Sequence, residues 1–261
     1  LMAADMIESC IKRTLQAFEK WLQKGGKSTD YMVPIGISAM INVVIDAKNQ
    51  SLKLCAVDGI DVHQYHTKID EFLEKVSQQM IRGLVQKLIS VLENVLGKLA
   101  RYDEGSVFAP IFNFTSQINI SKVLNPASSS QNPPANELGL SYVNFIRANL
   151  EIFHQKINDE LWILGLFEYW YTQTMNAICD WLTDRLDLSL HPYQMTCLGL
   201  IVKKTYSEFE IQGAPEVCLR SKTYQTIYAR MQMEEANVHL KMEGGTGGER
   251  MFPARGEEND Y

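Results

Sequence analysis

Apolar residues recur every three or four positions from His63 to about Ala100, and this run constrains the fold more than any other feature of the chain. A helix over this range would be roughly 55 Å long, at a rise of about 1.5 Å per residue. A second apolar stripe lies beside the first and widens the hydrophobic face. Such a helix needs neighbours on two sides, so the pattern predicts a multi-helix bundle. The stripes are Ile69, Leu73, Val76, Met80, Leu84, Leu88, Leu92, Val95 and Leu99, and Phe72, Ile81, Val85, Ile89 and Leu96.

Further helical patterns lie on both sides of this run, and no segment shows convincing strand alternation, so we expect an all-α fold. The first helix is expected to bury one face and to end at Gly25-Gly26. That face consists of Met2, Met6, Cys10, Leu15, Phe18 and Leu22. Other helices are expected over about 34–54, around 142–157, over 163–188, from Pro192 to Gly213, and from Ser221, which we expect to be an N-cap, through Met231.

A segment with three prolines and a Ser triplet, NISKVLNPASSSQNPPANELG, interrupts the periodicity from Asn119 onward. We expect a flexible connector over 119–138 that separates a helical bundle at 1–118 from a second bundle at 139–242. A short helix is expected around 106–114. The Gly-rich, charged residues 243–261 are expected to be a disordered tail.

The charge balance excludes one broad class of function. Lys and Arg number 25 and Asp and Glu number 31, which gives a net charge of −6. A general nucleic-acid binder needs a concentrated basic face, so we expect no nucleic-acid partner. Five cysteines lack CxxC spacing and predict reduced thiols. The charge-free runs at 31–45 and 105–121 are too short and too polar to span a bilayer. The chain starts in helical rhythm without Met, so we expect a fragment of a longer protein.

The stretch LFEYWYTQTMNAICDWLTDRLDL, residues 166–188, holds the densest aromatic pattern. Large side chains at helical spacing are most often core, where each contributes about 1.5–3 kcal/mol by leaving water. Because Trp and Tyr are also favoured interface anchors, a partner-binding groove is the alternative. The main stripe is Ile163, Phe167, Trp170, Thr174, Ala177 and Trp181, and the adjacent one is Tyr171, Met175, Ile178, Leu182 and Leu186.

Asp180, Asp184 and Asp187 share one helical face at i, i+4 and i+7, a spacing that would suit magnesium held against a diphosphate. That chemistry needs a second acidic cluster facing the first, and none is apparent. We therefore interpret the aspartates as a solvated helix end, with Arg185 available as their partner. No metal ion, cofactor or small-molecule substrate is expected.

Other polar motifs carry weaker signals. His63 and His66 lie one turn apart without a third ligand and are interpreted as a polar helix start. The basic pairs Lys12-Arg13 and Lys203-Lys204 are candidate contacts for a partner or for acidic lipid. GGTGG lacks the Lys-Ser/Thr of a phosphate loop. No catalytic triad or Cys-His arrangement is apparent, so we expect that the chain is not an enzyme.

Several segments, in order along the chain, resemble the calcium-dependent activator protein for secretion (CAPS) family. They include DMIESCIKRT at 5–14, HQYHTKIDE at 63–71, KLARYDEGSVF at 98–108, WYTQTMNAICDWLTDRLDLSLHPYQ at 170–194 and SKTYQTIYARMQMEEA at 221–236. The stretch is similar to the C-terminal part of the MUN region of that family. The departures lie in the connector and in the tail, which is less acidic than expected of the family.

The resemblance implies an elongated stack of antiparallel helical bundles that is not enzymatic. It implies a vesicle-priming factor that binds syntaxin and SNARE complexes and promotes their assembly for calcium-regulated exocytosis of dense-core vesicles. The implied location is cytoplasmic, peripheral at dense-core vesicles, the presynaptic terminal and the plasma membrane. Solvent-facing residues of the helices at 63–100 and 192–209 are the candidate contacts. The alternatives are a membrane-surface or tethering scaffold without SNARE contact and a magnesium- and diphosphate-dependent all-α enzyme.

Overall fold

The computed structural model describes residues 2–57, 62–105 and 134–241, and over these ranges the chain is helical without any strand. The expectation of an all-α fold is confirmed. The expected helix at 106–114, most of the expected connector and the expected tail at 243–261 lie outside the described residues. The elements are α1 (Met2–Leu22), α2 (Ile35–Val57), α3 (Val62–Leu99), the 3-10 turn η1 (Ala100–Tyr102), α5 (Ala135–Lys156), α6 (Glu160–Thr183), α7 (Pro192–Ile211), α8 (Glu216–Leu219) and α9 (Lys222–Lys241).

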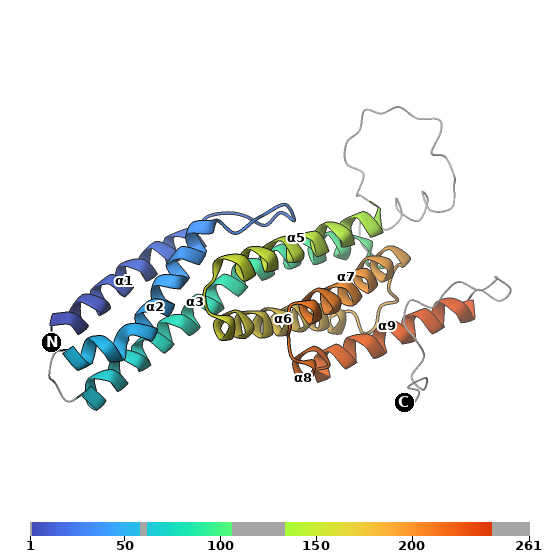
Figure 1. The fold of residues 1–261 in the computed structure, drawn as a ribbon. Helices are drawn as coiled ribbons and strands as arrows, with labels where there is room; N and C mark the ends of the chain where they lie inside the picture. The colour runs from blue at the N-terminus through green and yellow to red at the C-terminus, as the bar shows by residue number, and fades with distance from the viewer. Residues whose placement is uncertain (1, 58–61, 106–133, 242–261) are drawn as a thin grey trace.

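The 38-residue helix α3 runs through most of the elongated molecule (Figure 1). Its first part packs against α1 and α2, and it also forms a large contact with α6. The predicted first stripe is confirmed, because all nine of its members are buried. In the second stripe Phe72 is half-buried and the other four residues are buried. α3 therefore contributes to the cores of both ends of the rod.

The helix α5 begins at Ala135, within the range expected for the connector. It packs most extensively on α7, and Gly139 lies where the two helices approach closely. A Cβ at Gly139 would lie 2.8 Å from Leu200 Cδ2 and 3.3 Å from the carbonyl oxygen of Cys197. The division into two bundles stays a prediction, and the described buried residues from both halves form one connected hydrophobic cluster.

The predicted buried face of α1 is wrong at Met6 and Cys10, and the side chain of Met2 lies outside the described residues. Met6 is 65% exposed and Cys10 is exposed, whereas Ile11 and Phe18 are each 1% exposed. The predicted face contains a step of five residues, from Cys10 to Leu15, which turns the side chains away from a common stripe. The observed face keeps steps of three and four, and its members are Ile7, Ile11, Leu15, Phe18 and Leu22.

The aromatic stripe of α6 is confirmed as core, with Trp170 fully buried. The edges of Phe145 and Phe209 meet its indole at ring-centroid distances of 6.2 and 5.3 Å. The adjacent stripe is confirmed as far as Leu182 but is wrong at Leu186, which is 63% exposed. The helix ends at Thr183, so Leu186 lies in the following turns and no longer shares the helical face.

A partly buried polar network joins the end of α3 to the end of α6. The guanidinium of Arg185 donates to both carboxylate oxygens of Asp103, with Nε–Oδ1 at 2.9 Å and Nη2–Oδ2 at 2.8 Å. Its Cζ lies 3.8 Å from the ring centroid of Trp181. Gln194 of α7 donates to Asp103 Oδ1 and to the Leu99 carbonyl. The expectation that Arg185 partners the nearby aspartates is corrected, because a bidentate carboxylate is available from another element.

The turn between α6 and α7 is held from both sides. On one side, His191 is the N-cap of α7, and its Nδ1 accepts from the Tyr193 amide at 3.1 Å. On the other side, Arg230 of α9 donates to the carbonyls of Arg185 and Leu188 at 3.0 and 2.9 Å. Arg230 is also ion-paired with Glu234 at 2.7 Å, so this buried charge is compensated.

The loop between α1 and α2 is fixed to α5 and α3. Asn149 accepts from the Val33 amide at 2.8 Å and donates to the Tyr31 carbonyl at 3.1 Å. Lys87 of α3 donates to the carbonyls of Leu22 and Lys24 at the end of α1. Burial lowers the pKa of the Lys87 amine. These contacts satisfy backbone groups that α1 leaves unpaired at its C-terminus.

Other sequence-based expectations concern the cysteines, the helix starts and membranes. The four cysteines with described side chains are free thiols, as expected. The predicted starts of α7 and α9 are confirmed, since Pro192 is the first residue of α7 and the Tyr224 amide donates to Ser221 Oγ at 3.3 Å. Over the described residues, every helix is too short or too polar to cross a bilayer.

We predict that Trp181→Ala lowers the free energy of unfolding by about 3–5 kcal/mol, because a buried aromatic ring is replaced by a cavity. Chemical denaturation followed by circular dichroism measures the change. Leu161→Ala on the same helix is the control, since that side chain is 81% exposed and its truncation should change stability little. A Trp181→Ala variant as stable as the parent would show that the indole is not core.

We predict that stability falls as the pH drops below about 6.5, because burial lowers the pKa of His191. The unfolded chain binds the proton first, so this contribution is complete above the unfolded pKa and is lost as the pH falls through the folded pKa. Protonation also removes the Nδ1 acceptor that caps α7. Denaturation between pH 7.5 and 5 should show a smaller loss in His191→Asn, which keeps an N-cap acceptor that does not titrate. If the parent and His191→Asn lost the same stability between pH 7.5 and 5, His191 would not be the source of the pH dependence.

Candidate interaction surface

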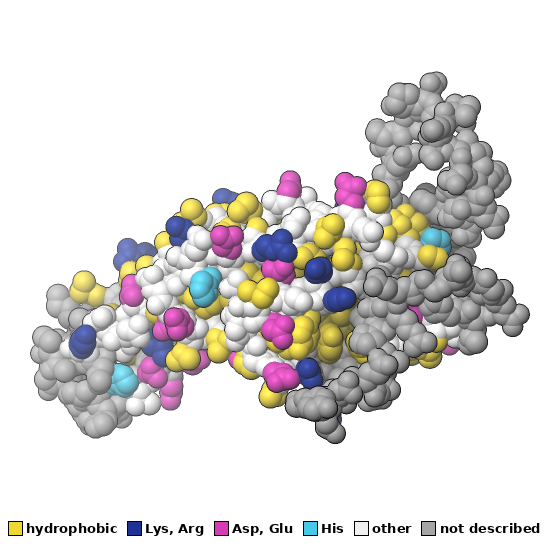
Figure 2. Space-filling model, turned by 45° about the vertical axis from the view of Figure 1, so that its right-hand side comes forward, with side chains coloured by type: hydrophobic (Ala, Val, Ile, Leu, Met, Phe, Trp, Pro, Cys, Tyr) yellow, Lys and Arg dark blue, Asp and Glu magenta, His cyan; other side chains and the backbone are white. Residues whose placement is uncertain are grey.

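The four basic residues predicted as contacts do not form one patch. Lys12 and Arg13 are exposed on α1, and Lys203 and Lys204 are exposed on α7. α1 and α7 occupy different parts of the rod (Figure 1). Lys12 is ion-paired with Glu8, one turn earlier. On the face drawn in Figure 2, basic and acidic side chains are interspersed, which is typical of a solvated surface. The role of these four residues stays a prediction.

The aspartates of the α6 end do not form a metal site. Asp180, Asp184 and Asp187 are exposed, and only Asp180 lies within α6 because the helix ends at Thr183. Among the described residues, no group of three His, Cys, Asp or Glu side chains is placed to hold a metal ion. The side chain of His63 lies outside the described residues, so the interpretation of the His63–His66 pair stays a prediction.

A groove runs between α1 and α3, and we call it the α1–α3 groove. Its apolar floor is made by Phe18, which is 1% exposed, and by the half-buried Leu15 and Leu22. Gly83 forms part of the α3 wall, and a Cβ there would lie 2.6 Å from Leu22 Cδ1. The groove encloses about 570 Å³. The remaining lining residues are Glu19, Lys75, Gln78, Gln79, Arg82 and Gln86.

The charges of the α1–α3 groove are mainly positive. Lys75 and Arg82 are exposed, and neither has a hydrogen bond or ion pair with another described residue. The single carboxylate, Glu19, accepts a hydrogen bond from Gln79 at 2.7 Å. A negatively charged group could therefore approach the two cations without displacing an existing ion pair.

A second groove lies over α3 between α2 and the start of α6, and we call it the α2–α3–α6 groove. It encloses about 360 Å³. Trp162 is fixed in its wall, because the indole Nε1 donates to Ser77 Oγ at 2.6 Å. Leu161 stands at the rim and is 81% exposed. The apolar floor and walls are completed by Val44, Ile45 and Ile81.

The charges of the α2–α3–α6 groove are mainly negative. Glu74 and Asp159 oppose the single cation Lys48, which lies 2.6 Å from Glu74. The hydrogen bond between them raises the pKa of Lys48 and lowers the pKa of Glu74. Gln78 lines both grooves, so one exposed ridge of α3 separates a positive groove from a negative one. We call this combined surface the α3 grooved face.

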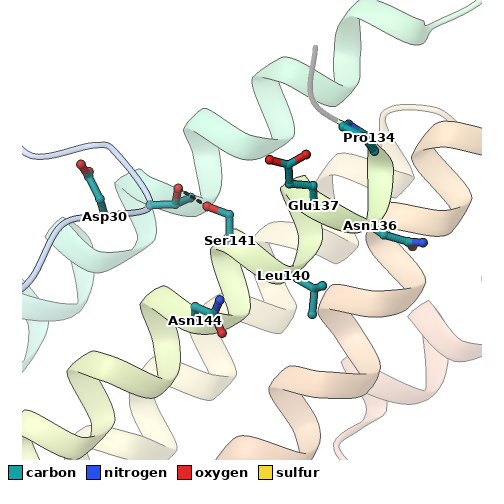
Figure 3. A pocket seen from close by; sticks show the side chains of 8 residues that line it. Asp30, Pro134, Asn136, Glu137, Leu140, Ser141 and Asn144 are labelled. Carbon is teal, nitrogen blue, oxygen red and sulfur yellow. Dashed lines mark hydrogen bonds between the residues drawn. The ribbon is translucent and has the colours of Figure 1, made fainter. Parts of the chain in front are cut away.

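A separate hollow lies between the α1–α2 loop and the start of α5 (Figure 3). Its two ionisable lining residues are Asp30 and Glu137, and the hydrogen bond between Thr29 and Ser141 lies between them in the view. Leu140 lines the hollow and is 45% exposed. This acidic hollow shares no lining residue with the α3 grooved face.

Sequence reasoning placed candidate contacts on the exposed side of the helix at 63–100, and the ridge of the α3 grooved face lies within that range. Its polar residues Lys75, Gln78, Arg82 and Gln86 step by three or four along α3, opposite the buried stripes. That signal was available in the sequence. The walls supplied by α1, α2 and α6 were not, because they depend on which helices pack beside α3.

Comparison with known proteins gives a family match over most of the chain and a relative that aligns with all of it. The family model of the MUN domain matches residues 1–166 and 163–209. A calcium-dependent secretion activator of Drosophila melanogaster is 46% identical over 263 residues, an alignment that covers 100% of this chain and 17% of that protein. No solved structure matches the chain. The first two findings confirm the family resemblance of the sequence segments.

We predict no saturable binding of magnesium with inorganic diphosphate, because the exposed aspartates do not converge on a common point. Isothermal titration calorimetry of the chain and of Asp184→Ala should give the same heats of dilution. Saturable binding that Asp184→Ala abolishes would instead support the alternative of an all-α enzyme.

Proposed function

The chain belongs to the MUN domain family, and on that premise we propose that it is part of a vesicle-priming factor that binds syntaxin and SNARE complexes. Through this binding it promotes SNARE assembly for calcium-regulated exocytosis of dense-core vesicles. The name of the Drosophila relative, a calcium-dependent secretion activator, supports a role in secretion. The chain spans 17% of that relative, so the activity of the whole protein enters here as a proposal.

The observation that carries the proposal is the α3 grooved face. Amphipathic helices bind other proteins by laying an apolar stripe into a groove between helices. Both grooves offer an apolar floor bordered by polar side chains, which suits such a stripe. The adjoining helix ends are tied down, for example by Lys87 at the end of α1. The face is therefore largely preformed, and less ordering entropy is lost when a partner binds.

The proposed mechanism is positioning. SNARE segments on two membranes must meet in register before they pair. A stiff rod that holds one segment raises its effective concentration near the other and so accelerates pairing without any chemical step. In this mechanism the chain acts at the cytoplasmic face of dense-core vesicles, the presynaptic terminal and the plasma membrane.

We predict that this chain captures the cytoplasmic part of syntaxin and the assembled SNARE complex in a pulldown, and that it accelerates SNARE assembly followed by fluorescence energy transfer. A groove variant should lose both effects because a new side chain fills the docking space. Gln86→Trp in the α1–α3 groove is suitable, because Gln86 is exposed and lines that groove.

Gly97→Trp is the matched control, because Gly97 is on α3, has open space around its Cβ and lines neither groove. It should bind and accelerate assembly as the parent chain does. Failure of the parent chain to bind syntaxin or the SNARE complex, with its helical content and melting curve intact, would overturn the proposed function.

A further inference from the structure

Two exposed cations stand along the α1–α3 groove without partners among the described residues. Lys75 and Arg82 are seven residues apart on α3, so they lie on one side of the helix about 10 Å apart along its axis. Surface cations often lie near a carboxylate of the same chain, as Lys48 does at the neighbouring groove. Among the described lining residues of the α1–α3 groove, the one carboxylate, Glu19, already accepts a hydrogen bond from Gln79. The groove therefore presents a positive edge.

The space beside these cations has the length and chemistry for a short helix. From Lys75 to Gln86 the groove follows α3 for about 16 Å, which corresponds to three helical turns. The floor is the apolar row of Leu15, Phe18 and Leu22 on α1. The exposed amides of Gln78, Gln79 and Gln86 can donate or accept along the rim.

We propose that the α1–α3 groove binds an amphipathic helix of a partner protein that carries acidic residues along one edge. The apolar stripe of that helix packs on the half-buried Leu15 and Leu22, while carboxylates two turns apart reach Lys75 and Arg82. This inference rests on the proposed function for the identity of the partner, a SNARE helix. It adds the groove, the sign of the charge and the spacing of the acidic residues.

The opposite charge of the neighbouring groove gives the partner an orientation. An acidic edge is attracted by Lys75 and Arg82 on one side of α3 and repelled by Glu74 and Asp159 on the other. Such a charge pattern favours one seating over its reverse. A flat anionic bilayer satisfies only part of these features, because lipid headgroups would contact the cations but leave the recessed apolar floor uncovered.

The test measures binding by fluorescence anisotropy with two probes. One is the labelled syntaxin SNARE segment, and the other is a synthetic amphipathic helix with Leu on one stripe and Glu on one edge. A synthetic helix with Lys in place of Glu is its counterpart. We expect the double variant Lys75→Glu with Arg82→Glu to bind both acidic-edged probes at least about tenfold more weakly than the parent. Raised salt should weaken parental binding in the same direction.

The matched control is Lys156→Glu with Lys222→Glu, which changes the net charge equally at exposed positions of α5 and α9 outside both grooves and should bind as the parent does. A second groove variant, Lys75→Gln with Arg82→Gln, removes the charges without reversing them and should give an intermediate loss. All four changed positions are exposed, so each variant should keep the parental melting curve. If the Glu double variant of the groove has a lower melting temperature than the parent, the Gln double variant takes its place in the comparison.

The outcomes separate the inference from the proposed function. If the groove variants and the control variant bind the probes as strongly as the parent chain does, the inference is overturned and the proposed function stands. Binding of the synthetic Glu-edged helix but not of syntaxin would support the groove and overturn the function. Preference for the Lys-edged helix would overturn the inference. The inference would also be overturned if the chain bound neither helix but floated with phosphatidylserine vesicles, and if the groove variants lost this flotation. It would likewise be overturned if the loss of binding in the groove variants paralleled a change in self-association measured by light scattering.

Discussion

The burial of α3 on two sides is the constraint on which the rest of the structure depends. Leu73, Leu84 and Leu92 are each 0% exposed, and they lie along most of the helix length. Each fully buried side chain of this kind contributes about 1.5–3 kcal/mol. One unbroken helix contributes buried side chains to the core at both ends of the rod. The helices that pack on it are therefore fixed relative to one another. The two grooves of the α3 grooved face are spaces left between that helix and its neighbours.

The sequence predicted the fold most accurately where a regular apolar pattern was long. Two stripes over 38 residues leave little choice of register, so the buried face of α3 was predicted correctly. In α1 the apolar residues allowed two faces, and the predicted one, which has a five-residue step, was wrong at Met6 and Cys10 but correct from Leu15 onward. At Leu186 the pattern continued past the end of α6, because periodicity alone does not show where the chain leaves the helix.

Contacts between residues distant in the chain lay beyond such reasoning. Asp103 and Arg185 are 82 positions apart, and their pairing depends on where α3 and α6 end in space. The same holds for Asn149, which binds the backbone of Tyr31 and Val33 in the α1–α2 loop. For the grooved face, the sequence indicated the exposed polar side of α3 but not the floor, because Phe18 comes from another helix. Local sequence patterns thus indicate which side of a helix is exposed to solvent. Which helices pack beside it depends on contacts between distant parts of the chain.

The contact of Arg230 with the turn after α6 has a consequence for the order of folding. The carbonyls of Arg185, Leu186 and Leu188 accept from a guanidinium that lies more than 40 residues further along the chain. On the ribosome, α6 and α7 emerge before that group is available. The three hydrogen bonds from Arg230 to the turn can form only after α9 has been synthesised and has docked. Docking of α9 therefore completes the packing of this end of the rod.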